Sequence, residues 1–155
     1  MIRVNTLLDN KCWNKRLKET PIFFKKLISY FPPKYHFKNK KVNFTVLLSD
    51  NHKIKKLNNK FRKKNKPTDV LSFPFDKIDK KKIIYLGDII ISYEFMNKPK
   101  KLSNLEFQDK VIKTFIHGFL HLLNYDHKLL KDFKKMNKEE LKIYSFINKK
   151  IEKFI

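Results

Sequence analysis

The sequence has a single cysteine, only two glycines and no alanine, and it lacks any long apolar run. Because Cys12 has no partner within the chain, no intramolecular disulfide can form, and we expect a reducing, cytoplasmic compartment. No segment approaches the roughly 20 apolar residues that span a bilayer, so we expect no membrane association. The first residues also lack the apolar segment of a secretory signal.

Arginine and acidic residues are scarce as well. Lys and Arg number 37 against 15 Asp and Glu, a formal charge of +22, yet only Arg3, Arg16 and Arg62 are arginines. The lysine excess can arise from a genome rich in AT codons. The charge attracts polyanions whatever its origin, so it favours a nucleic-acid partner without saying whether the contact is specific.

The remaining composition is that of a folded domain. A chain of 155 residues is close to the commonest domain size, and 41% hydrophobic with 14% aromatic residues supply a core. Disorder is therefore a poor interpretation despite the charge. We see no internal repeat or linker, and we expect one domain over residues 1–155.

Runs of apolar or alternating residues predict the strands 2–8, 42–48, 70–75 and 83–92. The last of these is a continuous apolar run, typical of a strand buried on both faces. The lysine-rich segment 76–82 is most simply a solvated loop.

Helices are predicted where a start signal precedes residues at helical spacing. These signals are Thr20 before Pro21, Asp50, and the capping boxes Ser103–Glu106 and Asn137–Glu140. The corresponding helices reach the Pro32-Pro33 pair, Arg62, Leu123 and Ile151. Strands interspersed with helices indicate either an α+β or a mixed α/β fold.

The segment 117–127, HGFLHLLNYDH, carries three histidines at a spacing that suits one metal ion. His117 and His121 lie one turn apart on the same face of a helix. His127 requires the chain to turn, and Asn124 can adopt the left-handed conformation that ends a helix. Three imidazoles leave one position open on tetrahedral Zn²⁺, which is the arrangement of a catalytic zinc site.

The alternative is that these are ordinary core or surface histidines. The apolar stripe of this helix consists of Ile112, Ile116, Phe119 and Leu123. On a helical wheel, His117 and His121 point roughly 130–170° away from that stripe, which argues against a core role. A solvated face would explain two histidines but not three at this spacing. His36 and His52 match no such pattern, and we expect them on the surface.

The same histidine spacing occurs in the metzincin proteases, in which a Glu beside the first histidine is the general base. Gly118 occupies that position here and has no side chain. We therefore expect a metal site without proteolytic activity by this mechanism. The metal could still activate water against another electrophile.

Three segments resemble successive motifs of the YbeY family, metal-dependent endoribonucleases that mature ribosomal RNA. They are LNNKFRKKNKPTDVLSFPF at 57–75, LGDIIIS at 86–92, and HGFLHLLNYDH at 117–127. The resemblance implies a single α+β domain with a small mixed β-sheet flanked by helices. One of these helices would resemble the zinc helix of metalloproteases.

The resemblance also implies a set of site residues. Its zinc ligands, for one Zn²⁺ per chain, would be His117, His121 and His127. Arg62 would be the active-site arginine. Independently of the resemblance, its planar fork can hold phosphate oxygens bidentately, and the sequence alone allows a surface cation at a helix end equally well. Thr68, Asp69 and Ser72 match too, but Thr68 and Asp69 can equally just shape the turn before the strand.

Both glycines, Gly87 and Gly118, fall inside matching motifs. In a chain that seldom uses glycine, this indicates close backbone approach or special torsion angles. The family usually has glycine where this chain has Asn124. Because Asn tolerates the left-handed conformation, we expect the turn to persist at modest cost.

The function implied is a zinc-dependent endoribonuclease that cuts single-stranded RNA. It would process precursor ribosomal RNA at the 3′ end of the small-subunit RNA and act in ribosome quality control. Its partners would be this RNA and the small ribosomal subunit, and no DNA partner is expected. His117, His121 and Arg62 would form the catalytic centre. The sequence assigns no general base, because Asp126 sits beside a ligand but can equally orient a histidine. Attack by the substrate's own 2′-hydroxyl, with the metal elsewhere in the mechanism, is also open. The alternatives are a ribosome-associated RNA-binding factor with structural zinc and, less favoured because of Gly118, a zinc protease.

Overall fold

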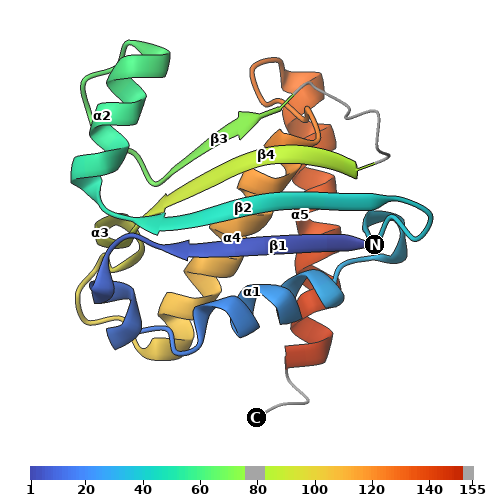
Figure 1. The fold of residues 1–155 in the computed structure, drawn as a ribbon, viewed down its shortest axis with the longest axis horizontal. Coiled ribbons are helices and arrows are strands. Elements are labelled where there is room, and N and C mark those ends of the chain that lie inside the picture. Colours follow the sequence, from blue (N-terminus) through green and yellow to red (C-terminus); the bar gives the residue numbers. More distant parts are fainter. Residues whose placement is uncertain (76–82, 152–155) are drawn as a thin grey trace.

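In the computed structural model, which describes residues 1–75 and 83–151, four strands form one mixed sheet (Figure 1). The strands are β1 (Ile2–Leu8), β2 (Lys41–Ser49), β3 (Val70–Pro74) and β4 (Ile83–Ser92). Their spatial order is β1-β2-β4-β3, with β1, β2 and β4 parallel and β3 antiparallel to β4. β3 is therefore an edge strand of the described sheet.

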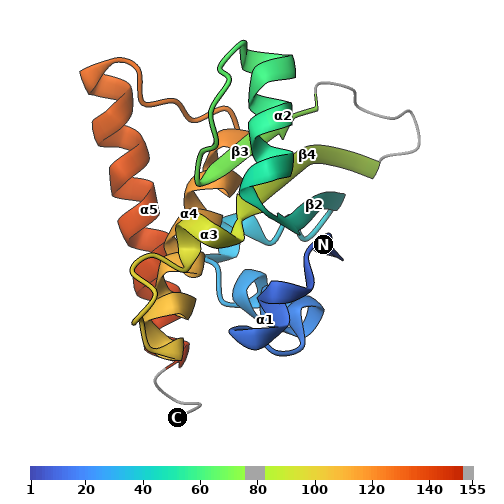
Figure 2. The same cartoon turned by 90° about the vertical axis from the view of Figure 1, so that its left-hand side faces the viewer.

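Helices cover the two faces of the sheet unequally. The described helices are α1 (Thr20–Ser29), α2 (Asn51–Arg62), α3 (Tyr93–Met96), α4 (Asn104–Leu122) and α5 (Leu130–Ile151), with the short 3-10 turns η1 (Lys11–Lys15) and η2 (Pro33–Tyr35). α1, α4 and α5 pack on one face over the main core, whereas α2 packs on the other face over a small cluster (Figures 1 and 2). The α+β class with a small mixed sheet is confirmed.

The alternation of β2 explains this division. Val42, Phe44, Val46 and Leu48 are fully buried, and the residues between them are only partly buried, because successive side chains point to opposite faces. Phe44 packs against Phe115 and Phe119 of α4, with ring centroids 6.0 Å and 5.4 Å away. This aromatic layer holds α4 against the centre of the sheet.

Both glycines mark places where the backbone leaves no room for a side chain. A Cβ on Gly118 would lie 2.9 Å from Ile89 Cγ2, so α4 sits closely on the sheet there. A Cβ on Gly87 would lie 2.1 Å from the Phe73 carbonyl oxygen, and Gly87 has φ +135°, which L-residues rarely adopt. The register of β2 with β4 shifts beside this glycine. The predicted need for close approach and unusual torsion is confirmed.

The last helix begins at Leu130 rather than at Asn137, so the predicted capping box is wrong. Asn137 and Glu140 lie inside α5, whose buried stripe is Met136, Ile143 and Ile147. Asp132 is in the first turn, where a carboxylate interacts favourably with the helix dipole. The box at Ser103 and Glu106, in contrast, is present at the start of α4.

Smaller differences concern other boundaries. α1 ends at Ser29 and takes Glu19, not Thr20, as its N-cap residue. In β4 only Gly87 and the residues from Ile89 to Ser92 are buried, and α2 covers the end that contains Ile90, so the prediction that the whole strand is buried was wrong. His52 is exposed as predicted, but His36 is partly buried.

The predicted loop 76–82 lies outside the described residues. Among helices in the described ranges, none combines the length and apolarity needed to cross a bilayer.

Candidate metal centre

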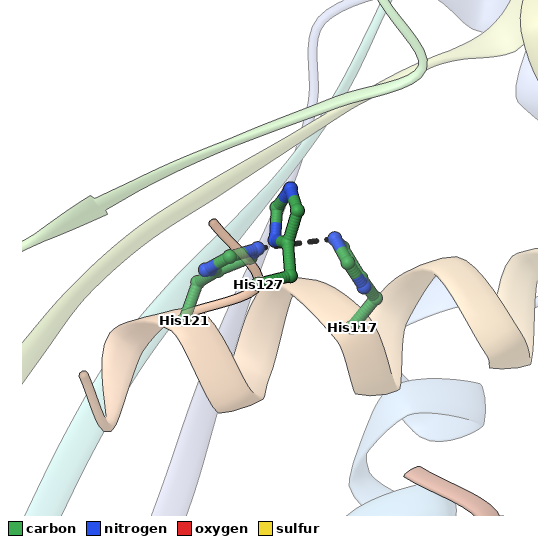
Figure 3. A group of neighbouring side chains, drawn as sticks. All are labelled: His117, His121 and His127. Carbon is green, nitrogen blue, oxygen red and sulfur yellow. Dashed lines mark hydrogen bonds between the residues drawn. The ribbon is translucent and has the colours of Figure 1, made fainter. Parts of the chain in front are cut away.

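The end of α4 and the turn that follows it bring three histidines together (Figure 3). His117 and His121 project from the same face of α4. Asn124 has φ +67°, the predicted left-handed conformation, and it reverses the chain so that His127 returns to the other two. One nitrogen from each ring lies within 4.8 Å of the other two, so these side chains could hold a metal ion.

The rings of His117 and His121 are each oriented by a contact at Nδ1. Nδ1 of His117 lies 2.9 Å from Oε1 of Glu140, and Nδ1 of His121 lies 2.9 Å from the carbonyl oxygen of Tyr125. The two Nε2 atoms face each other at 3.0 Å (Figure 3). When each Nδ1 carries the proton and donates it to its oxygen, each Nε2 presents a lone pair toward the shared space. This donor set suits a cation that prefers nitrogen.

Electrostatics favour the neutral form of His121. Burial lowers the pKa of His121, and the neighbouring His117 lowers it further. A neutral imidazole is the form that binds metals. His121 is therefore available as a metal ligand near neutral pH.

Glu140 was missed as a site residue by sequence reasoning, which assigned it to a helix start. It reaches His117 from α5 across 23 positions of sequence. Asp126, considered as a base or as an orienting group, accepts a hydrogen bond from the backbone N–H of His127 at 2.7 Å. That bond is the main cause that lowers the pKa of Asp126. Asp126 thus orients the His127 backbone as a carboxylate.

A cleft of about 820 Å³ opens over the histidines. Its walls carry the cations Arg62, Lys64 and Lys128 together with Ser72 of β3. Arg62 is the last residue of α2, and its Nη2 donates to the carbonyl oxygen of Ser72 at 3.4 Å. Buried Asn58 donates to the carbonyl oxygen of Lys66 at 2.8 Å and so holds the loop that follows α2. The structure therefore brings Arg62 to the same cleft as the three histidines.

The other residues of the matching motif have structural contacts. Asp69 Oδ1 accepts from the backbone N–H of Val70 at 2.8 Å and from Thr68 Oγ1 at 3.2 Å, so this pair shapes the entry to β3. Ser72 Oγ donates to the Gly118 carbonyl oxygen at 2.9 Å and ties β3 to α4. Both carboxylates that line the cleft, Asp69 and Asp126, thus accept backbone N–H groups.

Gly118 separates this centre from a proteolytic one. A Cβ at this position would point at the sheet, 2.9 Å from Ile89 Cγ2 and 3.1 Å from Ser72 Oγ. A glutamate in the place of the metzincin base would therefore collide with the strands. The packing of α4 on the sheet excludes that base, which agrees with the expectation drawn from the sequence.

Comparison with known proteins places the chain among nucleases. The family model described as "Endoribonuclease YbeY" matches residues 8–148. A protein named Endoribonuclease YbeY from Pelagibacter ubique (strain HTCC1062) is 59% identical over 152 residues, covering 97% of this chain and 99% of the relative. A protein of the same name from Buchnera aphidicola subsp. Acyrthosiphon pisum is 38% identical over 140 residues, covering 90% and 88%.

Structural comparison agrees with the sequence comparison. The solution structure of TM1509 from Thermotoga maritima superimposes with a TM-score of 0.57 at 26% identity. The match covers 99% of this chain and 93% of that protein. Since the family model and both relatives match most of the chain, the chain belongs to the endoribonuclease YbeY family.

Proposed function

We propose that this protein is a zinc-dependent endoribonuclease that cuts single-stranded precursor ribosomal RNA in the cytoplasm, in association with the small ribosomal subunit. The observation that carries the proposal is the cluster of three histidines in one cleft with Arg62. Membership of the endoribonuclease YbeY family supports RNA as the substrate. We propose further that residues 1–155 form a single metal-dependent endoribonuclease domain of the YbeY type.

In this proposal His117, His121 and His127 hold the zinc ion. The bound metal supplies a Lewis acid beside the scissile phosphodiester. Arg62 binds the phosphate oxygens and stabilises the charge that develops on them, since its guanidinium can donate two parallel hydrogen bonds. Lys64 and Lys128 line the same cleft and hold neighbouring phosphates without reading sequence.

Metal content is the first test. Purified protein should contain one equivalent of zinc by elemental analysis, and the His117→Ala variant should contain much less. The matched control is His52→Ala, since His52 is exposed on α2 and away from the cluster. Wild-type protein that takes up no zinc in a zinc-containing buffer would contradict the assignment.

Cleavage is the second test. We expect Arg62→Ala to lower the cleavage rate of an unpaired RNA by about 100-fold while zinc content is unchanged, because a charge-stabilising donor is lost. Arg62→Lys should recover only part of this rate, since Lys has no planar fork. Arg3→Ala, at an exposed position of β1, is the control for loss of one positive charge. Equal activity of Arg62→Ala and wild type would point to a contaminating nuclease.

The His121→Ala variant distinguishes catalytic from structural zinc. The catalytic proposal expects a folded, inactive protein, as judged by circular dichroism and thermal unfolding. A variant that fails to fold would instead favour the RNA-binding factor with structural zinc. Cleavage of unstructured protein is not expected, because Gly118 leaves no room for the proteolytic base.

A further inference from the structure

The edge strand β3 has two different faces, and the cleft uses only one of them. Val70, Ser72 and Pro74 line the cleft. The alternate residue Phe73 points to the opposite face of the sheet, as the two-residue period of a strand requires. Phe75 directly follows the strand, and its backbone N–H still donates to the Leu86 carbonyl oxygen at 2.9 Å. The side of β3 away from the cleft therefore carries aromatic residues.

These residues belong to an aromatic strip, which consists of Phe61, Phe73, Phe75 and Tyr85. Phe61 of α2 meets Phe73 edge-on with centroids 5.2 Å apart, and Phe75 meets Tyr85 edge-on at 5.8 Å. Phe61 is 57% exposed and Phe75 is 52% exposed. An edge-on pair leaves the outer ring face open, so the strip offers flat apolar surface to a partner.

The strip lies where the sheet has little cover. On this face α2 packs over Ile90 and Leu71 through Ile54. No helix in the described part of the chain extends over the far end of β3, where Phe75 follows (Figure 1). The exposed rings thus have no described element above them.

Lysines lie beside the Phe61 end of the strip. Lys60 Nζ lies 5.2 Å from the centroid of the Phe61 ring, and exposed Lys63 and Lys64 lie two and three residues beyond Phe61 in the sequence. The carboxylate at the other end, Asp88, accepts the hydroxyl of Tyr85. Flat aromatic rings beside lysines are the combination that binds unpaired nucleic acid, in which bases stack on rings and phosphates meet cations.

We propose that the aromatic strip binds unpaired bases of the RNA strand that continues out of the cleft. The inference rests on the proposed function and adds how the strand is held beside the cut. The aromatic strip adjoins the cleft, because residues of the two alternate along the chain. Arg62, which lines the cleft, directly follows Phe61. Pro74, which also lines the cleft, lies between Phe73 and Phe75. A strand that crosses the β3 edge passes from Arg62 onto the rings.

The strip also gives a reason for preferring single strands. Bases in a duplex are already stacked on one another and cannot lie on protein rings. A duplex would contact the lysines but not the strip. The rings therefore discriminate unpaired from paired RNA, while the lysines bind both.

The experiment measures binding independently of cleavage. The probe is an unpaired 2′-O-methyl RNA oligonucleotide with one 2-aminopurine base, and its duplex serves as comparison. Phe61→Ala combined with Phe75→Ala changes two exposed side chains, so the fold should be retained. We expect the Kd for the unpaired probe to rise by about 10-fold or more, since loss of one stacked base costs about 5- to 100-fold. The duplex Kd should change by less than about 2-fold, because the duplex does not stack on the rings.

Three controls separate stacking from other effects. Phe146→Ala removes a 36% exposed aromatic ring from α5 and should leave both affinities unchanged. Phe75→Trp should keep the affinity and the quenching of 2-aminopurine fluorescence. Lys63→Gln should weaken binding of both probes alike, because it removes a charge and no ring.

The outcomes for the strip and for the nuclease are distinguishable. The proposal that the strip binds unpaired bases would be overturned by a double variant that binds the unpaired probe as tightly as wild type. It would also be overturned if the double variant lost affinity for the duplex and for the unpaired probe equally. The strip would then suit an apolar protein partner. Zinc-loaded protein that stacks the probe but never cuts natural RNA would leave the strip standing and refute the nuclease.

Discussion

Glu140 lies on α5 and contacts the ring of His117 through Nδ1 at 2.9 Å. A carboxylate in this position accepts a hydrogen bond from Nδ1–H, which fixes the proton on Nδ1 and leaves the lone pair of Nε2 for a metal. We expect Glu140→Gln to weaken zinc binding by about 10- to 100-fold, because the amide is a poorer acceptor and can present its N–H₂ group instead. Competition with a chromophoric chelator would measure this affinity directly.

Glu139 provides the matched control. It is the preceding residue of the same helix, but its carboxylate pairs with Lys34 at 2.8 Å and accepts the Tyr35 hydroxyl. Glu139→Gln should therefore leave zinc affinity unchanged while removing the same charge. If both variants lose affinity equally, net charge and not the contact to His117 sets the metal affinity.

At the scale of single residues, the features that were predicted correctly are those that depend only on nearby residues in the sequence. The histidine spacing, the turn at Asn124 and both glycines follow from the geometry of one helix and of glycine. Glu140 could not be predicted, because its role depends on how α5 packs against α4. The Asn137–Glu140 pattern is also a sound local signal, which the longer amphipathic stripe of α5 overrides.

The pairing of α4 with α5 depends on polar contacts as well as on the apolar stripe. Tyr144 of α5 donates its hydroxyl to Asp109 of α4, which also pairs with Lys113 at 2.9 Å. The hydrogen bond to Asp109 is the largest cause, followed by burial, that raises the pKa of Tyr144 to about 12. The folded protein therefore holds the phenol proton more tightly than the unfolded chain does.

This contact predicts a pH dependence of stability. Because the folded pKa lies above the unfolded value of about 10, the stabilisation is complete below pH 10 and is lost as the pH rises toward 12. We expect Tyr144→Phe to lower the free energy of unfolding by about 1 kcal/mol at neutral pH. The difference between variant and wild type should shrink across that alkaline window. Urea denaturation at several pH values measures both effects.

A double-mutant cycle with Asp109→Asn tests whether the contact itself is responsible. If Tyr144 and Asp109 act together, the double variant should lose less stability than the two single variants combined. Strict additivity, or a Tyr144→Phe difference that does not change with pH, would contradict the account.

Elements with a clear periodicity or a continuous apolar run were predicted well, and β1 has its predicted bounds although none of its residues is fully buried. β2 and α4 have uninterrupted buried stripes, and both were found close to their predicted bounds. The short helix α3 and the turns η1 and η2 were not predicted, because a single turn carries too little periodicity to be recognised. The parallel pairing of β1, β2 and β4 was also beyond the sequence, since strand order depends on contacts between distant segments.

For the molecule as a whole, part of the scarce negative charge is used in internal contacts. Glu139 pairs with Lys34, Glu140 contacts His117, and Asp109 accepts from Tyr144. The cleft walls, in contrast, present the cations Arg62, Lys64 and Lys128 beside the histidines. The charge of +22 thus provides attraction for a polyanion, whereas the proposed reaction would depend on a few side chains.

This division predicts how RNA binding responds to salt. Each phosphate contact releases counterions, so the logarithm of the affinity should fall with the logarithm of salt concentration by about 0.7 per contact for single strands. Replacing Lys64 and Lys128 by Gln should make this slope shallower by about 1.4, because two phosphate contacts are lost. Lys149→Gln, in the last turn of α5, is the control that should leave the slope unchanged. Fluorescence anisotropy with an unpaired oligonucleotide at several salt concentrations measures the slope. An unchanged slope in the double variant would show that the cleft lysines do not contact the strand, and the attraction would then come from the lysine surface elsewhere.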